Sequence, residues 1–251
     1  MADAEQTAAD GLDRRVAALW SDGTDRRPAL TRHRIITAAI SVADAEGLDA
    51  LSMRRVATEL GAGTMSLYRH VADKAELLGA MVEAVNAESP DLAEVAGDWR
   101  AKLEHAAREE YALSHRHPWV LGVPWSRSPL GPNSLAAVES VLGVVADLGL
   151  DHHDRVAVVF SVFRYVRGAA RDAVDAAAER RDGVPDEEWW AGSEDVIARF
   201  VDPARFPEVV GAYRAGALTQ TGPDGFEFGL ARVLDGVEAY VRSRTDAERG
   251  P

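Results

Sequence analysis

The residues best suited to chemistry in this chain lie in residues 52–74, SMRRVATELGAGTMSLYRHVADK, where hydroxyl, aromatic and cationic side chains follow a glycine-rich turn. Apolar residues repeat at helical spacing on both sides of the turn, which predicts a helix capped by Ser52, the turn and a second helix. The second helix is expected to present outward Thr64, Met65, Ser66, Tyr68 and Arg69. Small hydroxyls and a methyl-bearing side chain can contact base edges, while tyrosine, histidine and lysine can reach phosphates. The stretch is therefore predicted to recognise double-stranded DNA in the major groove.

Two further helices must position this stretch. Thr31 is a suitable N-cap and Gly47 a suitable stop for the helix that precedes it. Asp73 and Glu76 form a D-x-x-E capping box at the start of a fourth helix. These elements predict a three-helix unit on a connecting fourth helix, and we call this unit the head (residues 30–89).

The head resembles the DNA-binding domain of the TetR (tetracycline-repressor-like) family of transcriptional regulators. The resemblance rests on residue types at fixed spacing, namely Leu67, Tyr68, Arg69, His70, Val71 and Lys74. Gly63 departs from the pattern, because a serine or another capping residue is more usual there. The recognition helix could begin at Gly63 or Thr64. Because glycine has no side chain to cap the helix, the later start is expected.

The resemblance assigns roles to residues of the head. It implies base contacts by Thr64, Met65 and Ser66, and phosphate contacts by Tyr68, His70 and Lys74. Arg54 matches a position that often contacts a base or a phosphate, and Arg69 belongs to the same outward surface. Packing or capping roles for Tyr68 and His70 are the alternative.

The distribution of charge along the chain suits a DNA-binding protein. The chain has 251 residues, no cysteine and a net charge of −13. Residues 26–74 hold eight cations and five anions, or +3, and the rest holds 20 cations and 36 anions, or −16. A basic head on an acidic body suits binding of the head to the duplex.

Several classes of protein are excluded or disfavoured by composition. Without cysteine there is no disulfide, thiolate metal site or cysteine nucleophile. No secretion leader and no apolar run of membrane-spanning length is apparent, so a cytoplasmic protein with no membrane partner is expected. Histidines occur as His115 with His117 and as His152 with His153, but neither spacing suits a metal on a helix, and no metal or other cofactor is expected. The sequence His117-Pro118-Trp119 predicts a loop corner with the tryptophan buried.

The regions outside the head differ from each other. Residues 1–29 are expected to form a mostly mobile arm with one helical turn over residues 12–20. Its arginines could reach DNA, or the arm could be a solvated tail. Residues 90–251, the body, look helical throughout, with helices expected over residues 98–115, 134–148, 154–181, 186–200, 203–216 and 226–242. The expected fold is all-α, with the fourth helix joining the head to a larger helical domain for effector binding and dimerisation.

Two helices of the body carry apolar stripes that suit association. The candidate interface residues are Phe160, Phe163, Val174, Phe226, Leu230, Leu234, Val237 and Val241. In TetR-like proteins, helices at these places form a four-helix bundle between subunits, so the resemblance implies a homodimer that reads a palindromic operator. Packing of the last stripe within one chain is the alternative.

The resemblance also implies a small-molecule effector inside the body. The candidate lining combines aromatic residues with arginine: Trp119, Trp125, Phe160, Phe163, Arg164, Tyr165, Arg167 and Trp189. Such a lining favours a largely apolar effector, and the alternative is that these residues form ordinary core.

The sequence as a whole predicts a ligand-responsive transcriptional regulator, a repressor that its effector releases from DNA. It is not expected to be an enzyme, because no nucleophile motif, phosphate loop or supported pair of carboxylates appears. The alternatives are a helical interaction module or an enzyme-like body with a vestigial DNA-binding head.

Overall fold

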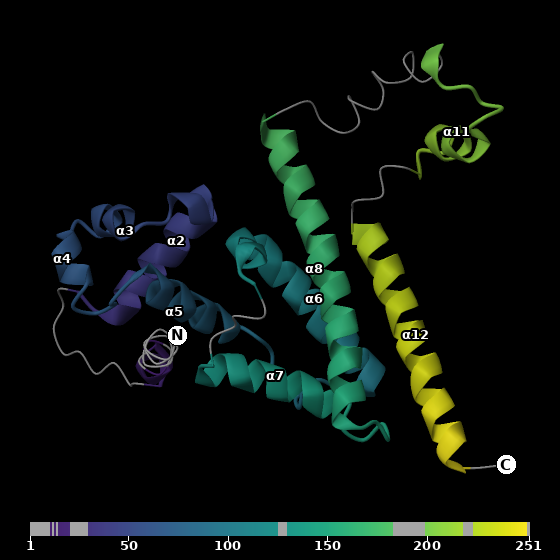
Figure 1. The fold of residues 1–251 in the computed structure, drawn as a ribbon, viewed down its shortest axis with the longest axis horizontal. Helices are drawn as coiled ribbons and strands as arrows, with labels where there is room; N and C mark the ends of the chain where they lie inside the picture. The colour runs from purple at the N-terminus through teal and green to yellow at the C-terminus, as the bar shows by residue number, and fades with distance from the viewer. Residues whose placement is uncertain are drawn as a thin grey trace, which may run out of the picture. The chain divides into compact units, whose positions relative to one another are not determined.

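The computed structural model describes residues 11, 13, 15–20, 30–124, 130–182, 199–217 and 223–249, and these residues form helices and no strand (Figure 1). The helices are α2 (Arg32–Ala50), α3 (Met53–Glu59), α4 (Thr64–Leu67), α5 (Lys74–Asn86), α6 (Trp99–Arg116), the 3₁₀ helix η1 (Pro118–Gly122), α7 (Pro132–Val144), α8 (His152–Asp182), α11 (Pro207–Arg214) and α12 (Pro223–Arg249). The all-α fold class is confirmed. Within the described ranges, no helix combines the length and the apolar character needed to cross a membrane.

The chain divides into two compact units, Met1–Val159 and Phe160–Pro251. The first unit contains helices α2 to α7 and the start of α8. The second contains the rest of α8 together with α11 and α12.

The predicted caps of the head are present. The hydroxyl of Thr31 accepts a hydrogen bond from the Arg34 N–H at 3.2 Å, and that of Ser52 accepts one from the Arg55 N–H at 3.1 Å. These bonds satisfy N–H groups that lack a partner in the first turn of a helix. The predicted stop at Gly47 is a break with φ +80°, after which α2 continues to Ala50.

The capping box at the start of α5 differs in one partner from the standard arrangement. Asp73 accepts from the Glu76 N–H at 2.7 Å, as expected. The Glu76 carboxylate, however, accepts from the Ala72 N–H at 2.9 Å and from the Arg32 guanidinium at 3.3 Å. Glu76 therefore caps one residue earlier than predicted, and its ion pair with Arg32 joins the start of α5 to the start of α2.

The core of the head extends beyond the head. Its fully buried members include Ile35, Val56 and Leu67, and the same cluster contains Leu113 of α6 and Trp119 of η1. Trp119 is 4 % exposed, so its predicted burial is confirmed, whereas the segment predicted as a loop corner begins the 3₁₀ helix η1. The first helices of the body thus help to form the core that supports the recognition helix.

Where the structure describes them, the α-helices of the body follow the predicted order, but their ends differ and the 3₁₀ helix η1 was not predicted. Helix α7 begins at Pro132, two residues early, and α11 begins at Pro207, later than residue 203. Proline fits the first turn of a helix because it lacks an N–H group that would have no partner there. Helix α12 is longer than predicted at both ends. Most of the predicted helix over residues 186–200 lies outside the described residues.

The helical turn predicted in the N-terminal arm is present at residues 15–19. The indole N–H of Trp20 donates a hydrogen bond to the Leu130 carbonyl at 3.0 Å. This bond ties the arm to the residue that precedes the N-cap of α7.

Candidate nucleic-acid interface

The recognition helix α4 begins at Thr64, as the glycine at its N-cap predicts, and Gly63 supplies no side-chain cap. Leu67 is fully buried and anchors the helix in the core. The Met65 side chain is 78 % exposed and Tyr68 is 45 % exposed. Helix α4 and its C-cap residue Tyr68 therefore present an apolar and aromatic surface to solvent. The core of the head does not bury this surface.

Polar groups flank this surface. Arg69 is exposed, and its guanidinium donates to the Ser66 hydroxyl at 3.3 Å, which holds the two side chains together. Thr64 and His70 are half-buried. Lys74 is exposed at the first position of α5, and its ammonium donates to the Leu48 carbonyl at 3.4 Å.

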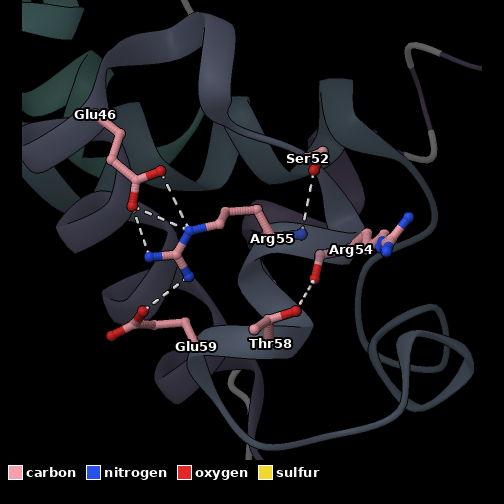
Figure 2. A network of polar contacts seen from close by, with 6 residues as sticks. All are labelled: Glu46, Ser52, Arg54, Arg55, Thr58 and Glu59. Carbon is pink, nitrogen blue, oxygen red and sulfur yellow. Dashed lines mark hydrogen bonds and ion pairs between the residues drawn. The ribbon is translucent and has the colours of Figure 1, made fainter.

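Arg54 and Arg55 on α3 have different surroundings (Figure 2). The Arg55 guanidinium contacts Glu46 of α2, with Nη2 2.6 Å from Oε1, and contacts Glu59 at 2.9 Å. The hydrogen bond from Arg55 lowers the pKa of Glu46, and the bonds to Glu46 and Glu59 raise the pKa of Arg55. Arg55 therefore joins α2 to α3, and its charge is matched by neighbouring carboxylates.

The guanidinium of Arg54 points away from this cluster, and the residue is exposed (Figure 2). The backbone of Arg54 takes part in the local structure, because its carbonyl accepts the Thr58 hydroxyl at 3.0 Å. Of the two neighbouring arginines, Arg54 is thus the one with a guanidinium directed to solvent. Sequence alone does not distinguish them, since the partners of Arg55 include a residue of another helix.

The connecting helix α5 is fixed by Glu83, a residue that the sequence analysis missed. The side chain is 6 % exposed, and its carboxylate accepts the Ser134 hydroxyl at 2.7 Å and the Asn133 N–H at the start of α7. Asn86 adds a bond from its amide to the Ser134 hydroxyl at 2.8 Å. A carboxylate at a helix N-terminus is stabilised by the free N–H groups there. The only sequence signal was a charged residue on the buried face of α5.

The candidate effector residues lie in different surroundings. Trp119 is in the core shared with the head, and its indole N–H donates to Asp44 at 2.8 Å. The Tyr165 hydroxyl contacts the Phe226 carbonyl at 2.8 Å and so joins α8 to α12. The Arg164 guanidinium lies 5.4 Å from the centre of the Phe160 ring. Phe163 is buried and Arg167 is half-buried, while Trp125 and Trp189 lie outside the described residues.

The candidate interface residues are largely covered within a single chain. Phe163, Phe226, Leu230, Leu234 and Val237 are at most 7 % exposed. Phe160, Val174 and Val241 are partly exposed. The partly exposed members are therefore the ones that retain apolar area for a second subunit.

Two family profiles match this chain and together span most of it. Residues 35–81 match the profile described as "Bacterial regulatory proteins, tetR family". Residues 90–241 match the profile described as "Tetracyclin repressor-like, C-terminal domain". The first covers most of the head and the second most of the body.

Individual proteins are similar over nearly the whole length. The HTH-type transcriptional repressor DrrR1 of Streptomyces coeruleorubidus is 41 % identical over 249 residues, which cover 96 % of this chain and 90 % of DrrR1. The class A tetracycline repressor protein from transposon 1721 of Escherichia coli is 26 % identical, over 83 % of this chain and 90 % of the repressor. Among solved structures, the Streptomyces coelicolor protein ActR in complex with actinorhodin has a TM-score of 0.71 and 27 % identity, over 85 % of this chain and 97 % of that one.

Proposed function

The chain belongs to the TetR family of bacterial transcriptional regulators, and we propose that it is a repressor that binds a palindromic operator as a homodimer and leaves it when a small, largely apolar effector binds. The observation that carries this proposal is the exposed surface at α4, where Met65 of the helix and its C-cap residue Tyr68 are exposed while Leu67 is buried. The family consists of transcriptional regulators and not of enzymes.

The proposed DNA contacts fall into two classes. Thr64, Met65 and Ser66 contact base edges, and Tyr68, Arg69, His70, Lys74 and Arg54 contact phosphates or adjacent bases. Arg54 is favoured over Arg55 because the Arg55 guanidinium is held by Glu46 and Glu59. Because bacterial DNA is the proposed target, we also propose that the protein acts in the cytoplasm.

The proposed domains are the arm (residues 1–29), the head (residues 30–89) and the body (residues 90–251). The body holds both the effector site and the dimer interface, the latter formed by α8 and α12. Two relatives support the roles themselves, because DrrR1 is named a repressor and ActR has been solved in complex with actinorhodin.

The proposed release mechanism passes through α5. An effector bound in the body that prefers a different placement of α5 against α7 disturbs the hydrogen bonds that Glu83 accepts from Asn133 and Ser134, and so moves the helix that carries the head. A coupling free energy of about 1–3 kcal/mol changes affinity by about 5- to 150-fold, which is enough to control a promoter.

The test begins with genomic DNA. Purified full-length protein is incubated with sheared DNA of the source organism, and the recovered fragments are sequenced. We expect enrichment of one or a few sequences with two-fold symmetry. Recovery of fragments without a shared symmetric sequence contradicts the proposal.

A matched pair of lysine variants then tests the assigned surface. The chain has two lysines, Lys74 on the head and Lys102 on α6. Lys74→Ala is expected to weaken binding to all sequences and to reduce the slope of log affinity against log salt concentration by about one, the contribution of one phosphate contact. Lys102→Ala is expected to leave both the affinity and the slope unchanged. Equal effects of the two variants on the recovered duplex contradict the assignment of the surface.

A further inference from the structure

The corner His117-Pro118-Trp119 lies where the body meets the head. Helix α6 ends at Arg116 and η1 begins at Pro118, so His117 occupies the junction. Its side chain is only 13 % exposed. The imidazole ring lies between two carboxylates of the head, one on α2 and the other just beyond the end of α5.

The contacts of the ring are short and involve both nitrogens. Nδ1 lies 2.8 Å from Asp44 Oδ1, and Nε2 lies 3.3 Å from Glu88 Oε1. Each carboxylate has a second donor from the body. The Trp119 indole N–H donates to Asp44 at 2.8 Å, and the Arg116 guanidinium donates to Glu88 at 3.0 Å. The imidazole and its two carboxylates are thus the centre of one polar network, which residues of α2, α6, η1 and the segment after α5 complete.

The protonation state of His117 decides how many of these contacts are favourable. An ionised carboxylate only accepts hydrogen bonds, and a neutral imidazole has a single N–H to donate. In either neutral form, one ring nitrogen therefore turns its lone pair toward a carboxylate oxygen of Asp44 or Glu88. The doubly protonated ring donates to both, and His117 and Arg116 then match the two negative charges.

We propose that His117 is a positioning residue for operator binding, which in its doubly protonated form bridges Asp44 and Glu88 and holds the head in one orientation on the body. Loss of one proton removes one of the two bonds and loosens the head. Because an imidazole gains a proton toward acid and loses it toward base, the orientation of the head responds to pH. The effect on operator affinity rests on the proposed function, whereas the bridge itself does not.

Two conservative variants separate the two bonds. In His117→Asn the amide nitrogen takes the place of Nδ1 and keeps only the bond to Asp44. In His117→Gln it takes the place of Nε2 and keeps only the bond to Glu88. His115→Gln is the matched control, because His115 is exposed on the same turn and contacts the Tyr111 carbonyl of its own helix at 2.8 Å.

The first measurement needs no DNA. The chain has no cysteine, so spin labels attach only to cysteines introduced at exposed Asp49 on α2 and exposed Glu139 on α7. Pulsed dipolar spectroscopy then gives the distance between the labels within one subunit, with labelled chain diluted by unlabelled chain. Spectra are recorded at about pH 5.5 and about pH 8, within or at the edge of the range in which histidine titrates. Circular dichroism confirms that each variant is folded.

The expected result is specific to His117. Wild type and His115→Gln show a narrow distance distribution at the lower pH and a broader one at the higher pH. His117→Asn and His117→Gln show broad distributions that do not change with pH. A wild-type distribution that is the same at both pH values, or a pH response that persists in both His117 variants, overturns the proposal.

The second measurement uses the duplex recovered from genomic DNA. Between the two pH values, the operator affinity of wild type is expected to change by about 5-fold or more beyond the change in affinity seen for His117→Gln. A change of about 5-fold is the lower end of the usual coupling between two sites. Equal changes in the two proteins overturn the positioning role even where the distances respond. If no operator is recovered, the proposed function fails, and the distance measurement still decides whether the bridge exists.

Discussion

Met65 and Ser66 are neighbours on the recognition helix with different environments. Met65 projects into solvent, whereas Ser66 is half-buried and accepts a bond from Arg69. A flexible apolar side chain can contact a thymine methyl group, and a hydroxyl held in place can bond to a base edge. Base selection by this head is therefore expected to come from close fit at a few atoms.

Single substitutions on α4 are expected to alter base preference. Met65→Ala and Ser66→Ala should each change affinity by about 1–3 kcal/mol at one or two positions of each half-site, with little change elsewhere. The measurement is binding to a library of single-base operator variants. Thr58→Ala, which removes an exposed hydroxyl on α3, serves as the control. A uniform loss across all positions for the α4 variants contradicts the assignment of base contacts.

The ion pair between Glu46 and Arg55 predicts how the stability of the fold depends on pH. The hydrogen bond from Arg55 lowers the pKa of Glu46 in the folded state, so the pair stabilises the fold above the ordinary carboxyl pKa of about 4.3. This stabilisation is lost as the pH falls through the lowered pKa. Glu46→Gln should therefore slightly lower the melting temperature at neutral pH, and the difference from wild type should vanish in acid.

The matched control is Asp49→Asn, which removes another exposed carboxylate from α2. Thermal unfolding followed by circular dichroism at several pH values measures both variants. The effect is expected to be small, because exposed ion pairs contribute little to stability. A difference between Glu46→Gln and wild type that grows toward low pH contradicts the explanation.

Sequence patterns predicted local contacts well and distant ones poorly. The caps by Thr31 and Ser52 were predictable because each joins residues three apart, and the residue types alone indicate them. The pair of Arg32 with Glu76 spans 44 residues of the chain, and no periodicity indicates it. The same limit explains why the different environments of Arg54 and Arg55 appear only in the folded chain.

At the scale of elements, the joint between α5 and α7 depends on the absence of a side chain at Gly131. A Cβ at this position would overlap the carboxylate of Glu83. The φ of Gly131 is −88°, so the backbone would accept another residue. Space for the buried carboxylate, and not backbone conformation, therefore requires glycine here.

Gly131→Ala is expected to displace Glu83 from Asn133 and Ser134 and to cost about 1–3 kcal/mol, the usual penalty for breaking a buried polar group's hydrogen bonds. Chemical denaturation measures the loss. Gly143→Ala inside α7 is the control, because a Cβ there meets open space and alanine favours the helix by about 0.5–1 kcal/mol. Equal stability of the two variants contradicts the role of Glu83.

The recognition helix was predictable as an element, and its support was not. Gly63 indicated the start of α4, and Leu67 with Val71 indicated the buried side. The hydrogen bond that Glu83 accepts from α7 and the contact between His117 and Asp44 join positions 50 or more residues apart. Such contacts depend on how helices pack, which hydrophobic spacing within one helix does not determine.

At the scale of the whole molecule, we propose that one head binds DNA weakly and that a two-fold dimer compensates by binding two half-sites. Val174 on α8 is partly exposed and lies in the predicted interface. Val174→Lys is expected to produce monomers in sedimentation and to weaken operator binding by about 100-fold, because the second half-site is no longer held close to its head. Asp172→Lys, an exposed change to the same residue type on the same helix, should leave both properties intact. A dimer of unchanged stability in Val174→Lys contradicts the predicted interface.

The core shared by the head with Leu113 and Trp119 has a consequence for exchanging parts between relatives. A cut after α5 leaves the recognition unit without two of its core residues, one from α6 and one from η1. A chimaera that takes its operator specificity from this chain must therefore carry two separate pieces of sequence, the N-terminal helices and the stretch around His117. Hybrids joined at a single point after α5 are expected to fold poorly, and restoring Leu113 and Trp119 should recover them.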